Sequence, residues 1–191
     1  MRRFLLKVAS TLAMLLVVLL VLAYVAGSRM EPGYEGRAQI ELRAAPGEVY
    51  AALEDFERLP HGGAAVREVR PLAIEASFGL GAEGAPALEA WTEDLGSSLV
   101  TVRTVEAVAP LRMVREMEDE ILPRTARWEL ELLPTSRGTQ VVLQHSGVIA
   151  DGPWQAPLLR LLVKGLGLAD QGAQEFLDGL AGHMGVEVVE S

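Results

Sequence analysis

The chain of 191 residues contains no cysteine, and this absence narrows its chemistry. Without a thiol there is no disulfide framework, no cysteine nucleophile and no cysteine metal site. Histidine is scarce too. The chain has three histidines, His61, His145 and His183, and they lie far apart in the sequence. The chain has no Gly-x-Ser-x-Gly, no His-Glu-x-x-His and no phosphate-binding loop. The sequence therefore predicts neither a bound metal nor a cofactor.

Positive charge is also sparse outside the N-terminus. The net charge is −9, but the first 30 residues carry four basic residues and no acidic one. The remainder carries 13 basic and 26 acidic residues, a net charge of −13. Because phosphate binding needs basic surfaces, we expect no nucleic-acid partner. The same negative field disfavours adsorption to anionic lipid headgroups.

Residues 8–28 form a run of 21 residues without a charged side chain, mostly Leu, Val and Ala. At about 1.5 Å per residue, a helix of this length crosses the roughly 30 Å of a bilayer core. Arg2, Arg3 and Lys7 precede the run, which places that end in the cytoplasm. We predict a single-pass protein of the cell membrane with its domain on the extracytoplasmic side. A cleaved signal peptide is the alternative, and it exports the domain as well.

The remaining length suits one domain with a sizeable core. The stretch 27–36, GSRMEPGYEG, consists of turn-forming residues and predicts a short linker. The predicted organisation is an anchor at residues 1–28, a linker at 29–36, a domain at 37–185 and a tail at 186–191.

The longest helical pattern outside the N-terminus covers residues 154–184. Gly165, Gly172 and Gly179 lie seven apart along it and form a stripe. Glycine costs about 1 kcal/mol relative to alanine inside a helix, so such a stripe indicates close approach or open space. We predict one long helix wrapped by a curved sheet, with the functional site in the space between them. Its apolar face, at spacings of three and four, consists of Leu158, Leu162, Leu166, Ala169, Ala173, Phe176, Leu180 and Met184.

The middle of the chain alternates apolar and polar residues, as an antiparallel meander does. A helix is predicted for residues 45–61, because Pro46 suits a first helical turn and Pro60 ends the pattern. Strands are predicted at residues 37–43, 65–70, 72–78, 87–93, 99–108, 111–118, 125–133 and 139–149.

The last hairpin can be registered from its pattern. With a four-residue loop at residues 134–137, Leu132 pairs with Thr139, and Ala126 pairs with His145. A slip by one residue would bury the charged set, so this register is favoured. It places His145 on the helix-facing side, opposite a small residue. The two intermediate pairs are Leu130 with Val141 and Trp128 with Leu143.

Two stretches resemble the START-like superfamily, also called SRPBCC. APGEVYAALEDFERLP, at residues 45–60, is similar to its first helix, and RWELELLPTSRGTQVVLQHSG, at residues 127–147, to its last hairpin. The resemblance covers about residues 37–184. It implies an α+β helix-grip fold, in which a curved antiparallel sheet and a long C-terminal helix enclose an apolar cavity. The superfamily includes polyketide cyclases, pollen-allergen-type carriers and lipid-transfer domains, so these structural motifs specify the fold far better than the function.

We predict that the helix-facing side chains bind a hydrophobic small molecule or lipid. His145 is a polar anchor, a general acid–base group or a core histidine satisfied by a neighbour. Arg115 shares a face with Met113, where it pairs with an anionic ligand head or lies in water at the rim of the sheet. No catalytic residue is assigned. The predicted ligand-binding residues are Trp91, Met113, Arg115, Trp128, Leu130, Val141, Leu143, His145, Gly172 and Phe176.

Three functions fit this pattern. The favoured one is a membrane-anchored carrier, whose ligand gains about 25 cal/mol per Å² removed from water. A polyketide cyclase or aromatase-like enzyme and an interaction module with a filled cavity are the alternatives. Residues 154–168 add a further hypothesis, a mildly basic amphipathic segment that dips into a membrane interface rather than packing on the sheet. Protein partners are left open.

Overall fold

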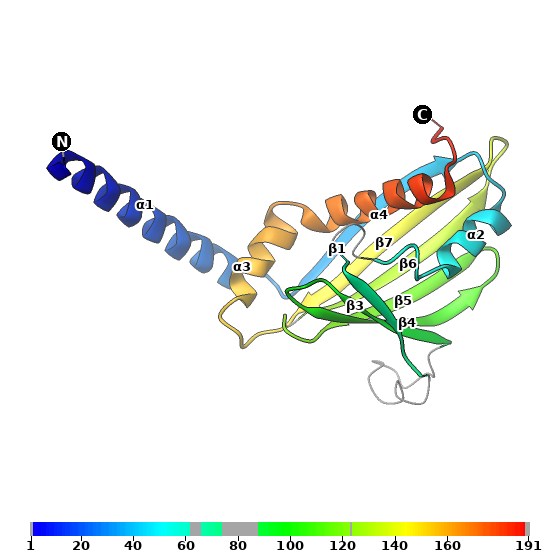
Figure 1. Cartoon of the computed structure of the whole chain (residues 1–191), viewed down its shortest axis with the longest axis horizontal. Helices are drawn as coiled ribbons and strands as arrows, with labels where there is room; N and C mark the ends of the chain where they lie inside the picture. Colours follow the sequence, from blue (N-terminus) through cyan, green and yellow to red (C-terminus); the bar gives the residue numbers. More distant parts are fainter. Residues whose placement is uncertain (1, 62–65, 74–87, 123, 190–191) are drawn as a thin grey trace.

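The computed structural model describes residues 2–61, 66–73, 88–122 and 124–189, with side chains from Lys7 onward. Parts of the strands predicted at 65–70, 72–78 and 87–93 lie outside the described residues. The elements, drawn in Figure 1, are α1 (Arg2–Ser28), β1 (Gly33–Leu42), α2 (Pro46–Glu54), β2 (Glu68–Pro71), β3 (Glu89–Asp94), β4 (Leu99–Val108), β5 (Arg112–Asp119), β6 (Arg124–Pro134), β7 (Thr139–Ile149), α3 (Ala156–Arg160), the π-helical turn η3 (Leu161–Gly165) and α4 (Leu168–Met184).

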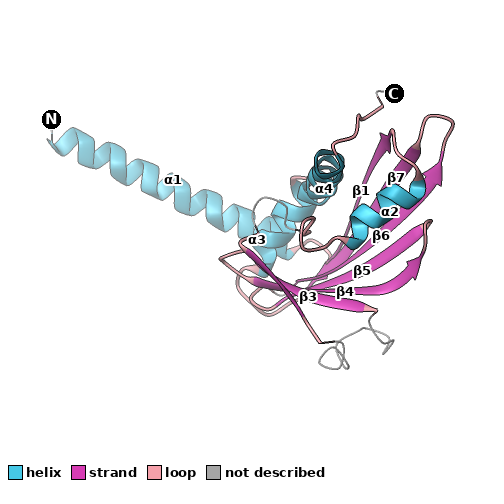
Figure 2. Ribbon diagram, turned by 45° about the vertical axis from the view of Figure 1, so that its right-hand side comes forward, coloured by secondary structure: helices cyan, strands magenta, loops and turns pink. Residues whose placement is uncertain are grey.

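The strands form one antiparallel sheet in the order β1-β7-β6-β5-β4-β3-β2. From β2 to β7 the sheet is a meander, and β1 completes it beside the last strand. The sheet curves, and α2 and α4 lie on its concave side (Figure 2). This arrangement confirms the predicted α+β helix-grip fold.

The main core lies between the concave face and these two helices. Leu130 and Leu143 face inward from neighbouring strands and are fully buried. Leu177 and Leu180 of α4 and Leu53 of α2 pack in the same cluster and are also fully buried. Alternation in the strands and helical spacing in α4 therefore direct their apolar side chains to one shared core.

The strand predictions are accurate in the second half of the sheet. The predictions for residues 99–108 and 139–149 coincide with β4 and β7, and those for β5 and β6 differ by one residue at each end. Boundaries in the first half were less accurate. The strands predicted at 65–70 and 72–78 are wrong where described, because β2 is Glu68–Pro71 and residues 66, 67, 72 and 73 lie outside any strand. β1 begins at Gly33, four residues before the predicted strand. Helix α2 ends at Glu54, because Asp55 leaves the helical region with φ −82° and ψ 65°.

The predicted register of the last hairpin is wrong by two residues. Pro134 pairs with Thr139, so the loop is 135–138 rather than 134–137. Trp128 consequently lies opposite His145, and Ala126 lies opposite Gly147. A two-residue shift leaves every side chain on its original face, so alternation cannot distinguish the two registers. His145 does lie on the helix-facing side, as predicted.

The predicted continuous helix over residues 154–184 is also wrong, because the segment contains a break. Gly167 adopts a φ of +68°, a left-handed conformation that glycine tolerates without steric cost. Just before it, the amide of Leu166 bonds the carbonyl of Leu161, a wider turn than that of an α-helix. The chain therefore changes direction between η3 and α4.

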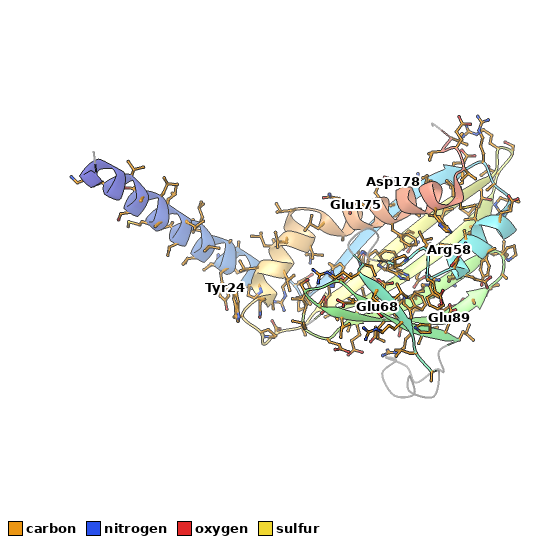
Figure 3. All side chains as sticks on the ribbon, in the orientation of Figure 1. Tyr24, Arg58, Glu68, Glu89, Glu175 and Asp178 are labelled. Carbon is orange, nitrogen blue, oxygen red and sulfur yellow. The ribbon has the colours of Figure 1, made fainter. Side chains whose placement is uncertain are left out.

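The break limits the predicted apolar face to α4. Leu162 and Leu166, which belong to that predicted face, are exposed. On the opposite side of α4, Glu175 and Asp178 point away from the sheet (Figure 3). The predicted glycine stripe is interrupted as well, since Gly165 precedes the break. Within α4 the predicted face is confirmed by the buried residues Ala169, Ala173, Phe176 and Leu180.

Helix α1 projects from the domain, and its last turns contact α3 (Figure 1). Its segment Lys7–Ser28 is long and apolar enough to cross a membrane. A signal sequence near an N-terminus has the same properties, so both sequence-based interpretations remain.

Candidate functional site

The concave face carries two groups of buried polar side chains beneath α4. One is built around His61, in the turn after α2, and the other around His145 on β7. The ring of Trp128 lies between them, with centroids 5.0 Å from His61 and 5.4 Å from His145. Phe176 of α4 stacks on His61 at 5.6 Å. The two groups therefore belong to one continuous surface between the sheet and the helix.

In the first group, Glu93 of β3 accepts three hydrogen bonds. The backbone amide of His61 donates at 2.8 Å, its Nδ1 at 3.1 Å and the indole nitrogen of Trp91 at 2.9 Å. Burial alone would raise the pKa of Glu93, but these hydrogen bonds outweigh it and lower the pKa to about 2. Glu93 is thus an anion held by a turn and by its own strand.

Arg115 completes this group from β5. Its Nη1 lies 3.2 Å from Nε2 of His61, and its Nη2 donates to the carbonyl of Leu53 at 2.5 Å. Its guanidinium also lies over Trp91, 4.9 Å from the ring centroid, which is a cation–π contact. Burial lowers the pKa of Arg115 to about 10, so it stays charged at neutral pH.

This geometry assigns the proton on His61. A guanidinium only donates, so Nε2 of His61 is the acceptor and Nδ1 carries the proton that Glu93 accepts. Burial lowers the pKa of His61, with the bond to Glu93 acting against it, which agrees with a neutral ring. A His–carboxylate pair is typical of general bases, but here Arg115 occupies the basic nitrogen. The group joins α2, β3 and β5 as a structural unit.

The second group is less completely bonded. Nε2 of His145 lies 3.4 Å from the hydroxyl of Tyr34, and burial lowers the pKa of His145 to about 4, partly opposed by the backbone of Ala169. Within the described part of the chain, Nδ1 of His145 and Nε1 of Trp128 have no hydrogen-bond partner of normal geometry. Trp128 is only 5% exposed, so its N–H is a buried donor that meets no acceptor in the described ranges. Buried polar groups in folded proteins are generally hydrogen-bonded, so this N–H is a position at which a water molecule or a ligand acceptor can bind.

Most of the predicted site residues come together on this surface. Trp91 belongs to a neighbouring hydrophobic cluster. Arg115 is hydrogen-bonded to His61. Gly172 is half-buried on α4, and a Cβ placed on it would meet no described atom within 4 Å. Met113, Trp128, Leu130, Val141, Leu143 and Phe176 share one apolar cluster.

Sequence reasoning missed three residues of this surface. Glu93 follows Trp91 by two positions in a strand, so alternation signals an acid on the inner face. Tyr34 fell in the predicted linker, and His61 was the last residue of the predicted helix, whereas the structure has it in a turn. Contacts between a turn and a distant strand leave no local pattern.

No family model and no curated protein matches the sequence. Solved structures do match. TTHA0849 from Thermus thermophilus is 23% identical, with a TM-score of 0.57 over 79% of this chain and 97% of that one. The di-domain aromatase/cyclase StfQ of the steffimycin biosynthetic pathway is 12% identical, with a TM-score of 0.50 over 78% of this chain and 52% of that one. Ara h 8.0201 is 10% identical, with a TM-score of 0.50 over 80% of this chain and 97% of that one.

The fold is of the helix-grip type. At these identities the likeness establishes the fold alone, so any function must be argued from the residues of this chain.

The helix-grip domain also has a hollow of about 980 Å³, lined by charged, polar and apolar residues of β1, β4, β5, β6, β7 and η3. The basic side chains that line it form ion pairs. Arg127 bonds Glu116 at 2.7 Å, and Lys164 lies 3.6 Å from Glu31. None of the ten predicted ligand-binding residues belongs to this hollow. Its charged lining suits an apolar ligand less well than the concave face does.

Proposed function

We propose that the helix-grip domain binds a hydrophobic small molecule or lipid between its sheet and α4. The observation that carries this proposal is the buried N–H of Trp128 beside His145, which has no acceptor among the residues that the structure describes. Leaving such a donor without an acceptor costs about 1–3 kcal/mol. A ligand that presents an acceptor to Trp128 regains this energy, and its apolar part gains from the surrounding cluster.

The charges on this face favour a neutral ligand. His145 has a pKa of about 4 and is therefore uncharged at neutral pH. Arg115 is already engaged by His61 and by the carbonyl of Leu53. An anionic head would have to displace these contacts. The favoured class is a largely apolar molecule with a carbonyl, ester or hydroxyl oxygen.

Entry of such a ligand requires side chains to move. The rings of Trp128 and Phe176 are 4.8 Å apart, so they fill the space between sheet and helix. Gly172 lies one turn before Phe176 on α4, and the position of its missing side chain is open. We place the entry beside Gly172, with the ring of Phe176 turning aside.

We also propose that α1 anchors the domain on the extracytoplasmic side of the cell membrane. The support is the apolar length of Lys7–Ser28 and the basic residues at its start. An anchored carrier meets hydrophobic molecules at the surface where they are most concentrated.

The test begins with the full chain, extracted from its own membrane in mild detergent. Native mass spectrometry should detect a bound hydrophobic molecule, which is then identified and used for titration. Trp128→Phe keeps the ring but removes the donor, and we expect about 2- to 12-fold weaker binding, the value of one net hydrogen bond. Trp154→Phe is the matched control, because Trp154 is exposed and does not belong to the buried cluster around Trp128.

Two outcomes would contradict the proposal. A folded Trp128→Phe variant with unchanged affinity would remove Trp128 from the site. A native chain that never carries a hydrophobic molecule would favour an interaction module with a filled interior.

A further inference from the structure

Exposed apolar side chains gather where α1 joins the domain. We call Trp154, Leu162, Leu166 and Leu168 the junction patch. Trp154 is 68% exposed and Leu166 is 66% exposed, and the other two are also exposed. Single exposed apolar residues are normal on a protein, but a group of large ones marks an interaction surface.

The elements α3 and η3, next to this patch in the chain, pack against the end of α1. Gly27, in the last turn of α1, is buried on Pro157 of α3, and a Cβ on Gly27 would lie 1.8 Å from the Pro157 carbonyl oxygen. Further along, a Cβ on Gly165 would lie 3.4 Å from Cε of Met30. Trp154 precedes Pro157 by three positions, and Leu166 follows Gly165 directly. The patch therefore flanks the point at which α1 leaves the domain.

The position of the apolar segment of α1 identifies what covers the patch. That segment ends at Ser28, so when it spans a bilayer the contact between Gly27 and Pro157 lies at the membrane surface. Tyr24 lies at the same end of α1, beside α3 (Figure 3). Tyrosine and tryptophan are enriched at this depth, where an apolar ring with a polar edge fits best.

Charge indicates the kind of lipid surface. Arg160 is buried and bonds the carbonyl of Ile149 and the carboxylate of Asp151, so it does not reach headgroups. Lys164 pairs with Glu31 at 3.6 Å. The segment is thus less basic at its surface than its sequence indicates, and insertion rests on apolar area rather than on anionic lipid.

We infer that the junction patch lies in the interfacial layer of the bilayer that α1 crosses. The lipid that it contacts there is zwitterionic. This inference rests on the proposed anchoring and deepens it. Two attachments, α1 and the patch, hold the domain at a fixed orientation on the membrane. Leu168 begins α4 and Gly172 lies one turn later, so the entry proposed beside Gly172 is close to the lipid surface. A hydrophobic ligand then passes between bilayer and domain without crossing much water.

The first test uses the intrinsic tryptophans of the full chain in phosphatidylcholine liposomes. Trp91 and Trp128 are buried, so Trp154 is the tryptophan that a quencher reaches. Lipids brominated near the headgroup end of the acyl chain should quench its emission, and Trp154→Phe should abolish that loss. Quenching by aqueous acrylamide instead would place Trp154 in water and overturn the inference.

A second test uses the absence of cysteine, which makes every introduced cysteine a unique labelling site. Leu166→Cys and Leu111→Cys each receive an environment-sensitive fluorophore. Leu111 is a matched control, since it is 48% exposed and lies at the opposite end of the sheet, next to Arg112. Only the label at residue 166 should shift to shorter wavelength and respond to brominated lipid.

The remaining outcomes separate the two proposals. A label at residue 166 that is shielded from water but not quenched by lipid would indicate a protein partner or a second copy, and would overturn the inference. If alkaline extraction releases the chain from its native membrane, the anchoring fails and the inference with it. If the chain stays in the bilayer while Trp154 and residue 166 remain in water, only the inference fails.

Discussion

Burial of His145 as a neutral ring makes the stability of the domain depend on pH. Its pKa falls to about 4, chiefly because burial disfavours the charged form, and nearby Arg124 adds to this effect. The backbone of Ala169 and the charge of Asp170 act in the opposite direction. In the unfolded chain the pKa of histidine is about 6.5.

The sign follows from proton uptake. Between about pH 6.5 and pH 4 the unfolded chain binds a proton at His145 that the folded chain does not. The free energy of unfolding therefore falls as the pH is lowered through this range. With these two pKa values, the loss between pH 7.5 and pH 5 is about 2 kcal/mol. Burial also lowers the pKa of His61, which adds a loss in the same direction.

Urea unfolding of the full chain in detergent micelles at several pH values measures this effect. His145→Gln keeps hydrogen-bonding capacity but does not titrate, so its stability should fall by about 2 kcal/mol less over the same range. His183→Gln, at an exposed position, is the control and should follow the unmodified chain. If His145→Gln lost as much stability as the unmodified chain, His145 would not be buried as a neutral ring.

Three further substitutions test other parts of the structure. Glu93→Gln removes the charge that accepts three hydrogen bonds, and we expect at least about 1.5 kcal/mol of destabilisation in urea unfolding; a smaller loss would refute the assigned network. Gly179→Ala lies on an exposed helix position with open space, so the free energy of unfolding should rise by up to about 1 kcal/mol, and a fall would show an unrecognised contact. Gly27→Leu clashes with the Pro157 carbonyl, so proteolysis at the junction of α1 and α3 should accelerate while the unfolding midpoint of the domain stays constant; unchanged proteolysis would contradict the tight packing there.

Periodicity predicted most of the fold because apolar side chains predominate on the inner face of the sheet, apart from Glu93, Arg115 and His145. Alternation located β4 to β7 within a residue at each end. It failed where two solutions bury the same side chains. The observed hairpin register differs from the predicted one by two residues, and a two-residue shift leaves His145 on the same face of the sheet. The prediction of one continuous helix failed for a related reason. The apolar spacing continues through Gly167, but the helical backbone is interrupted there.

The site was less predictable than the fold, because its polar contacts join segments far apart in the chain. Alternation placed Trp128 and His145 inside but carried no information on their partners. His61 and Glu93 are 32 residues apart and meet through a turn, which has no periodic pattern. Tyr34 reaches His145 across 111 residues. Contacts between residues this far apart in the chain depend on the fold of the complete sheet and not on any local stretch.

The two histidines of the concave face suit neutral hydrogen bonding better than general-base catalysis. A general base works best when its pKa lies near the working pH and when its basic nitrogen faces the substrate. Nε2 of His61 faces Arg115 at 3.2 Å, so its lone pair is taken. His145 has a pKa of about 4, which makes it a weak base at neutral pH but a suitable neutral hydrogen-bonding group. Together with the N–H of Trp128, for which the described part of the chain offers no acceptor, it can orient a polar group of an apolar ligand, and orientation of this kind needs no titration.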